Sequence, residues 1–404
     1  MSLEKVIDKI FRDIEHKAKY DYLENIKKNI HVDIALNHFT WEKATNWNDL
    51  VRLLKDSNKY DKFNKKYQYI AGSASFVTLE NLANWLLRKS KQIGISAAIK
   101  CLDDYNNSDR LIIYVIMTVM SLRPYDKYIF SNGVQLLNQE NVSKINKKLS
   151  EDLLLDSIRS SVPSPFISSI FAYPIEKKIK HENSCEHDQE DNDYTQALKK
   201  INNVKECLIL SLGLNGLHTM AHKYIIPDQI PLVSTALGTS WGFETFYLPK
   251  ATEPFIKIEE LNEADRILVL YENLESSLKE SIKVSIERLN GYCSSSSYIE
   301  RAINIRTCLE SVFLNDNEVN EISSTLALRV SRFTGKTIDE RKEIYKLVKD
   351  CYSITSKAVH RGNIPDKQMK NISKLDHIAE ICRKVIIQKV ERGTDIDWKE
   401  IELN

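Results

Sequence analysis

The stretch from Thr337 to Gly362 reads TIDERKEIYKLVKDCYSITSKAVHRG, and it decides the fold of the C-terminal third of the chain. Thr337 and Glu340 have capping-box spacing, which is typical of a helix start. Gly362 and Pro365 are the signals that end it. Between them, apolar residues recur at helical spacing: Ile344, Leu347, Val348, Cys351, Tyr352 and Val359. The pattern predicts one long helix with a single buried side.

Four neighbouring segments show the same period. Ser297 and Glu300 repeat the capping-box spacing at the start of one of them. Three of the segments are followed by a glycine, the residue that most often ends a helix. The segments run from 262 to Gly291, from Ser297 to Phe313, from 318 to Gly335 and from Leu375 to Gly393. Five amphipathic helices with short connections predict a helical bundle.

The rest of the chain divides by composition. Residues 1–181 read as a mainly helical domain, with apolar residues at helical spacing from Leu79 to Leu87 and a buried helix expected from Leu111 to Leu122. Residues 182–193 (ENSCEHDQEDND) are acidic and predict a solvated linker. Residues 194–260 predict a small mixed α/β segment, in which the apolar run Cys207 to Leu212 suits a buried strand or a helix. The bundle then occupies 261–404, so the expected fold class is mainly α.

The composition of the chain limits the classes of function that are expected. The 404 residues carry a formal net charge of +1, so any nucleic-acid surface must be a local patch. The N-terminus has no basic-then-apolar signal pattern, and the apolar run from Leu111 is too short to span a bilayer. Seven cysteines without a CxxC pair fit reduced thiols. We therefore expect a cytoplasmic protein that is not bound to a membrane.

Four pieces in order carry a resemblance to a known family. They are the run Arg301 to Phe313 (RAINIRTCLESVF), the run from Thr325 (TLALRV), the pair Glu340-Arg341, and Cys351 to Gly362 (CYSITSKAVHRG). Together they resemble the ApeA-like HEPN domains of prokaryotic antiviral RNases, over roughly the last 140 residues. The resemblance implies a metal-independent ribonuclease without a cofactor, and a homodimer in which two such helices meet around one RNA-binding cleft.

The family signature is an Arg, four to six other residues, and then a His near the end of one helix. An imidazole can move protons at the 2′-hydroxyl or the leaving oxygen near neutral pH, and a guanidinium can hold charge on the phosphoryl oxygens. His360 stands at the His position, so the resemblance implies that it transfers the proton. Five residues earlier, the Arg position holds Thr355, a weakened substitute without a positive charge.

Four basic residues could replace the missing charge at the phosphate: Lys357, Arg361, Arg329 and Arg341. On a helical wheel Lys357 lies closer to His360 than Arg361 does. Each candidate also has a structural reading. Arg329 could pair with Glu310 to brace the bundle, since buried charges are seldom unpaired. The hydroxyl of Thr355 could bond back to its own helix.

Two clusters suit a metal, and neither leads us to expect one. His218 and His222 have the i, i+4 spacing of a helical zinc pair but lack the Glu of a metalloprotease. His181, Cys185 and His187 lie in or beside the acidic linker with no recognised spacing. The basic run Lys177-Lys178-Ile179-Lys180 reads as solvated surface. The aromatic residues are scattered, with no base-stacking motif of the RNA-recognition type.

The resemblance to the ApeA-like HEPN domains implies an antiviral-defence or toxin-like effector of the abortive-infection kind. Its N-terminal region would sense an invader or regulate, and its HEPN dimer would bind and cleave RNA, with a defence-system protein as a further partner. The alternative is a catalytically inactive HEPN subunit that acts as a dimerisation or scaffold module. The replacement at Thr355 is the feature that favours the alternative.

Overall fold

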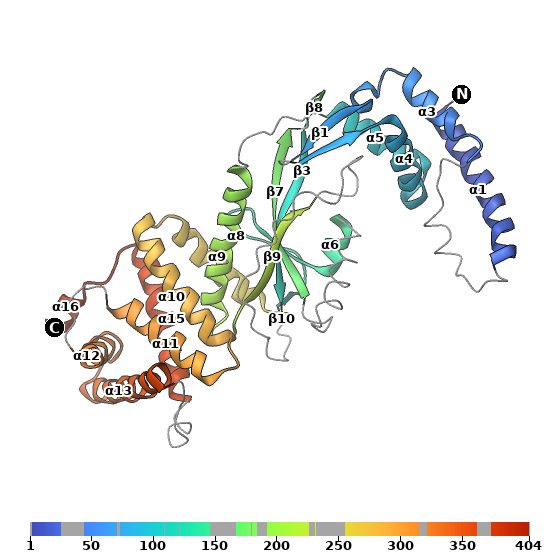
Figure 1. Cartoon of the computed structure of the whole chain (residues 1–404). Helices are drawn as coiled ribbons and strands as arrows, with labels where there is room; N and C mark the ends of the chain where they lie inside the picture. The colour runs from blue at the N-terminus through green and yellow to red at the C-terminus, as the bar shows by residue number, and fades with distance from the viewer. Residues whose placement is uncertain are drawn as a thin grey trace. The chain divides into compact units, whose positions relative to one another are not determined.

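A computed structural model describes residues 2–25, 44–70, 73–108, 110–120, 122–145, 167–178, 180–183, 192–225, 231, 255–314, 321–361 and 373–403. Helices predominate over strands in these ranges, so the expected mainly α class is confirmed (Figure 1). None of the described helices has the length and apolar character needed to cross a membrane. The chain divides into two compact units.

Unit 1 comprises residues 1–114, 174–193 and 224–239. Its described strands form a three-stranded antiparallel sheet in the order β2-β1-β8, and helices α1, α3, α4 and α5 pack with one another. The elements are α1 (Leu3–Asn25), α3 (Trp47–Asp56), η3 (Asp61–Phe63), β1 (Lys66–Ile70), β2 (Ser73–Val77), α4 (Leu79–Ile93), α5 (Ile95–Asn107) and β8 (Lys180–Glu182). The helix expected from Leu79 is confirmed as α4, where the Thr78 hydroxyl accepts a hydrogen bond from the Asn81 N–H.

The helix expected from Leu111 to Leu122 is wrong. This stretch is strand β3 (Arg110–Met120), which carries several β-branched residues that suit an extended backbone. The described strands β5 (Tyr128–Ile129), β6 (Gln135–Asn138), β7 (Ile167–Lys178), β3 and β9 (His218–Ile225) form a five-stranded sheet in that order. The sequence of β3 has no alternation of apolar and polar residues, and residues 115–119 are all buried, so periodicity could not separate this strand from a buried helix.

The boundaries expected at 181, 193 and 260 do not coincide with the two units, which are discontinuous along the chain. Residues 184–191 of the acidic segment lie outside the described residues. Cys207 to Leu212, which suited a strand or a helix, falls mainly in α8 (Asn192–Ser211). Together with β9, this helix makes residues 194–225 a mixed α/β segment, as expected.

Unit 2 contains the C-terminal helices. These are α9 (Ile258–Glu272), α10 (Ser276–Ser294), α11 (Tyr298–Phe313), α12 (Ile322–Thr334), α13 (Ile338–Arg361), α15 (Ser373–Arg392) and α16 (Trp398–Leu403). Helix α11 packs against α10, α13, α15 and α12, which makes it the central helix of the bundle (Figure 1). The helices beginning at Ser297, Thr337 and Leu375 are confirmed within a few residues.

The capping box at the start of α13 is also confirmed. The backbone N–H of Glu340 donates to the Thr337 hydroxyl at 3.2 Å, and the Thr337 N–H donates to the Glu340 carboxylate at 3.0 Å. Glu340 therefore has a lowered pKa, chiefly because its carboxylate accepts backbone hydrogen bonds. These two side chains therefore set the residue at which α13 starts.

The helix expected from 262 to Gly291 is wrong in two respects. It is divided into α9 and α10 at Asn273, whose side-chain amide donates to the Val269 carbonyl at 2.7 Å and satisfies the end of α9. Gly291 does not end α10, which continues to Ser294. A Cβ at Gly291 would lie 2.9 Å from the Asn304 side chain, so this glycine permits the close approach of α10 to α11.

The sheet side of unit 2 is attached to the bundle by buried polar contacts. The Tyr271 hydroxyl on α9 donates to the Glu206 carboxylate on α8 at 2.6 Å. Burial raises the pKa of Glu206, which is only 6% exposed. On α15, the Arg383 guanidinium donates to the Leu210 carbonyl at 2.8 Å. These contacts hold α8 against the bundle.

His181 of unit 1 is a neutral histidine inside a packed cluster. Its ring contacts Phe63 edge-on, with centroids 5.3 Å apart, and its Nε2 atom is buried without a hydrogen-bond partner. Burial, and then the charge of Lys62, lowers its pKa to about 4. The His181 side chain therefore serves packing between strand β8 and η3.

This pKa predicts a pH dependence of folding. The unfolded chain takes up a proton on His181 below about pH 6.5, whereas the folded chain resists it until about pH 4. The free energy of unfolding should therefore decrease as the pH falls through this window. Urea unfolding of wild type and His181→Phe at pH 7 and pH 5 measures the effect. The variant should lose less stability at pH 5, whereas His377→Gln, at an exposed site on α15, should behave like wild type. Equal losses in all three proteins would contradict the assignment.

Candidate functional site

Helix α13 presents one side to the bundle core and one to solvent. Val348, Cys351, Ile354, Thr355 and Ala358 are each at most 2% exposed. The opposite side carries polar residues that are exposed or half-buried, namely Lys346, Lys349, Ser353, Ser356 and Lys357. We refer to these five positions as the α13 outer face. The amphipathic period predicted from the sequence thus leaves a polar side on α13, where Lys349 donates to the Ser324 hydroxyl on α12 at 3.2 Å and Ser353 is exposed.

His360 and Arg361 lie in the last turn of α13, and their side chains lie outside the described residues. The helix itself continues through both positions. At 100° per residue, position 360 is about 20° from Ser353 around the helix axis and about 40° from Ser356. The backbone of residue 360 therefore belongs to the α13 outer face.

Thr355 does not belong to this face. Its side chain is 2% exposed, and its hydroxyl donates to the Tyr352 carbonyl at 3.1 Å. Position 355 is about 140° from position 360 around the helix. The catalytic role expected for Thr355 therefore has no geometric support, and its alternative role as a hydroxyl that bonds back to its own helix matches the structure.

Arg329 is a buried brace of the bundle. Its guanidinium donates to the Glu402 carboxylate at 2.6 Å and to the Phe313 carbonyl at 2.7 Å. The side chain is 3% exposed and lies 6.0 Å from the centre of the Trp398 ring. Arg329 therefore joins α11, α12 and α16, and its fixed bonds leave it away from the α13 outer face.

Glu310 pairs with a different arginine from the one expected. It accepts from Arg306 of its own helix at 2.9 Å rather than from Arg329. Arg306 also donates to the Tyr352 hydroxyl on α13 at 2.8 Å and lies 4.6 Å from the centre of that ring. One nitrogen of Arg306, Nη1, is buried without a hydrogen-bond partner. The cluster joins α11 to α13, and its i, i+4 Arg–Glu spacing was the sequence signal that could have indicated it.

Two more of the basic candidates can be placed. The Arg341 Nε donates to the Gly335 carbonyl at 3.0 Å, near the start of α13 and far along the helix from residue 360. Lys357 is half-buried on the α13 outer face, and no described residue forms an ion pair with it. It lies three residues before His360, so it is the described cation best placed to act with position 360 on a phosphate.

The two histidines with the i, i+4 spacing of a helical zinc pair lie on a strand, so they do not share one helix face. His218 and His222 are both in β9, where residues four apart are separated by about 13 Å along the strand. Burial lowers the pKa of His218. Within the described residues, no group of three or more His, Cys, Asp or Glu side chains could hold a metal ion. Cys185 and His187 lie outside the described residues.

Comparisons with known proteins add no functional assignment. No family model matches the chain, and no curated protein or solved structure is significantly similar to it. Any function must therefore be argued from the residues themselves and from the resemblance noted in the sequence.

The buried position of Arg329 predicts a stability effect. Arg329→Ala would leave the Phe313 carbonyl and the Glu402 carboxylate without their donor, which should lower the free energy of unfolding by about 1–3 kcal/mol. Arg332 is a half-buried arginine on the same helix α12 that forms no ion pair with a described residue, so Arg332→Ala should change the free energy of unfolding by less than about 0.5 kcal/mol. Urea unfolding measures both. Equal effects would show that Arg329 is not a brace.

Proposed function

We propose that the C-terminal bundle is a HEPN-like domain that binds RNA and cleaves it without a metal ion. In this proposal His360 transfers the proton, and Lys357 contacts the phosphate. The protein would be an effector of antiviral defence or a toxin-like protein, with unit 1 sensing or regulating. The observation that carries the proposal is the orientation of α13, because residue 360 and Lys357 then lie on the same polar side of the helix.

A second copy of the chain is the partner that this site needs. One imidazole and one ammonium supply one proton-transfer group and one cation, whereas a 2′-hydroxyl attack uses a base and an acid at opposite ends of the phosphate. Two α13 outer faces meeting in a homodimer would bring two His360 and two Lys357 side chains together. The hydroxyls of Ser353 and Ser356 on this face are small enough to allow the two helices to approach closely.

The geometry also suggests where the family arginine would act. The family pattern allows four to six residues between Arg and His, and Ser353 precedes His360 by six intervening residues. Ser353 is exposed on the same face as position 360, whereas Thr355 is buried. Ser353 is therefore the position at which a guanidinium could be introduced without disturbing the core.

The first experiment tests cleavage directly. Purified wild type, His360→Ala and Lys357→Ala are incubated with a labelled RNA in the presence of EDTA, and the cleavage rates are compared. His360→Ala should lower the rate by about 10²–10⁴ because the proton-transfer group is lost. Lys357→Ala should lower it by roughly 10²–10³ because a phosphate contact is lost. Lys342→Ala, an exposed lysine that pairs with Asp339 at the other end of α13, is the control and should match wild type. A His360→Ala protein as active as wild type would remove the nuclease proposal.

The alternative function is a catalytically inactive dimerisation or scaffold subunit. The observation that favours it is the absence of an arginine from the described part of the α13 outer face. The alternative function predicts that wild type leaves cellular RNA intact. Induction of Ser353→Arg should then cause growth arrest and RNA degradation. The double variant Ser353→Arg, His360→Ala should abolish this gain. A wild type that already degrades RNA would exclude the alternative.

A further inference from the structure

A short parallel pair of strands in unit 2 exposes an unusual set of side chains. Strand β4 (Arg123–Pro124) pairs with β10 (Phe255–Ile256), with Arg123 opposite Phe255 and Pro124 opposite Ile256. Pro124 and Ile256 point into the core, whereas Arg123 and Phe255 are exposed. Because side chains alternate along an extended chain, the next residues on the exposed side are Tyr125 and Lys257.

The two aromatic side chains on this side form a stack that faces solvent. The rings of Tyr125 and Phe255 have centroids 4.6 Å apart and planes inclined by 15°. Tyr125 is 72% exposed, which is high for a large aromatic ring, and Phe255 is 43% exposed. A free aromatic face in water is a surface that a ligand can cover with a gain in free energy.

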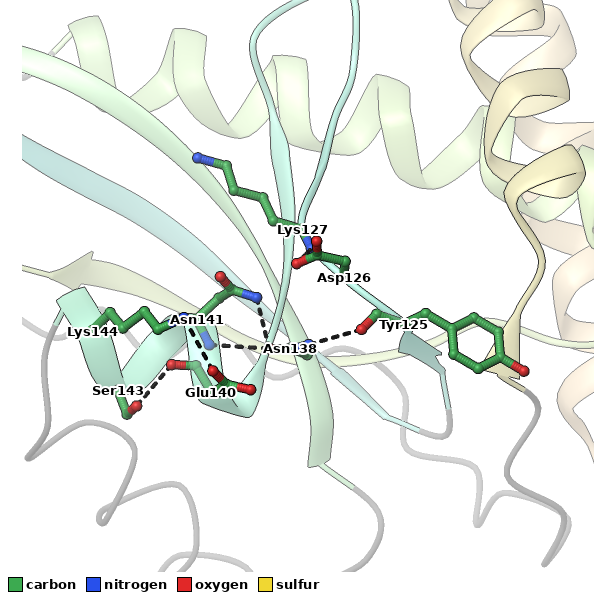
Figure 2. Close-up of polar contacts among 8 residues, drawn as sticks. All are labelled: Tyr125, Asp126, Lys127, Asn138, Glu140, Asn141, Ser143 and Lys144. Carbon is green, nitrogen blue, oxygen red and sulfur yellow. Dashed lines mark hydrogen bonds and ion pairs between the residues drawn. The ribbon is translucent and has the colours of Figure 1, made fainter.

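The Tyr125 ring is presented from a fixed backbone. The side-chain amide of Asn138 donates to the Tyr125 carbonyl at 3.4 Å, while its oxygen accepts from the backbone and side chain of Asn141 at 3.0 and 2.8 Å. Asn138 is only 8% exposed. Figure 2 shows the Tyr125 ring extending away from this polar cluster, on the side opposite the Asn141 amide. The stack therefore has a defined direction, which lowers the entropic cost of binding.

Two cations flank the stack. The Arg123 guanidinium lies 5.9 Å from the centre of the Phe255 ring, and Lys257 follows β10 on the exposed side. Neither forms an ion pair with a described residue. Two acidic residues close in sequence accept backbone hydrogen bonds: one oxygen of Asp126 accepts from the Lys127 N–H at 2.7 Å, and one oxygen of Glu260 accepts from the Lys257 N–H at 2.9 Å. The side chain of Lys127 points away from the Tyr125 ring (Figure 2).

We propose that Arg123, Tyr125, Phe255 and Lys257 form a binding face for single-stranded RNA, in which a base stacks on the Tyr125 ring and the cations contact phosphates. Aromatic rings interleaved with unpaired cations are how proteins bind single strands, whose bases are free to stack. A duplex has no free base face to offer. The choice of RNA rests on the function proposed above, whereas the stacking face is independent of the α13 outer face.

Binding is tested with a fluorescein-labelled 2′-O-methyl RNA of twelve nucleotides, which cannot be cleaved through its 2′ position. Tyr125→Ala should weaken binding roughly 5- to 100-fold, the range that loss of one base stack produces, and Tyr125→Phe should restore it. Arg123→Gln should reduce the slope of log K against log salt concentration by about 0.7 in magnitude, because one phosphate contact is lost. Phe76→Ala is the matched control, since Phe76 is also exposed and contacts another aromatic ring, Tyr67, but lies on β2.

The proposal is overturned if wild type does not bind the single strand, if it prefers the duplex of the same sequence, or if Tyr125→Ala binds as tightly as wild type. It is also overturned if Tyr125→Ala dissociates an oligomer in sedimentation while RNA binding is unchanged, because the face would then be a protein interface. Failure of the nuclease proposal would give a different result: wild type and His360→Ala would cleave RNA at the same rate, while wild type would still bind the uncleavable strand.

Discussion

The burial of one side of α13 determines which of its side chains can meet a ligand. Val348, Cys351, Ile354 and Ala358 fill the space against the rest of the bundle, and Thr355 is buried with them. Once this side is fixed, the helix period leaves positions 346, 353 and 360 on the opposite side, seven residues apart. Arg306 reinforces the orientation, because it holds Tyr352 from the neighbouring helix α11. Every functional statement about the C-terminal bundle depends on this rotation of one helix.

The sequence predicted most where the signals are local. Capping boxes and the 3.6-residue period located α11, α12, α13 and α15. Both signals depend only on residues that are close together in the sequence. It failed where a pattern has two meanings. The apolar run from Leu111 was predicted to be a helix and is a strand. Gly291 was predicted to end a helix, and it permits the close contact of α10 with Asn304 instead.

Two residues predicted for the candidate site are directed into the bundle core, for a physical reason. Motif spacing names residues along the chain, but the direction of a side chain depends on which face of the helix is buried. Thr355 and Arg329 were therefore chosen by spacing and charge, whereas packing directs both inward. Likewise, the partner of Arg329 is Glu402, which is 73 residues distant, and no local pattern could indicate it. The stack of Tyr125 on Phe255 joins residues 130 positions apart, so no local pattern of aromatic residues could indicate it.

The pairing of two α13 outer faces is the central claim, and cysteine cross-linking tests it most directly. Ser353→Cys is prepared with Cys101 and Cys185 replaced by serine, so that the remaining native cysteines are buried thiols. Mild oxidation should convert this protein to a disulfide-linked dimer, since residue 353 is exposed on the face that the two copies are proposed to share. Lys342→Cys in the same background should remain monomeric on a non-reducing gel. If Ser353→Cys also stays monomeric, the two helices do not meet and the proposed cleft does not exist.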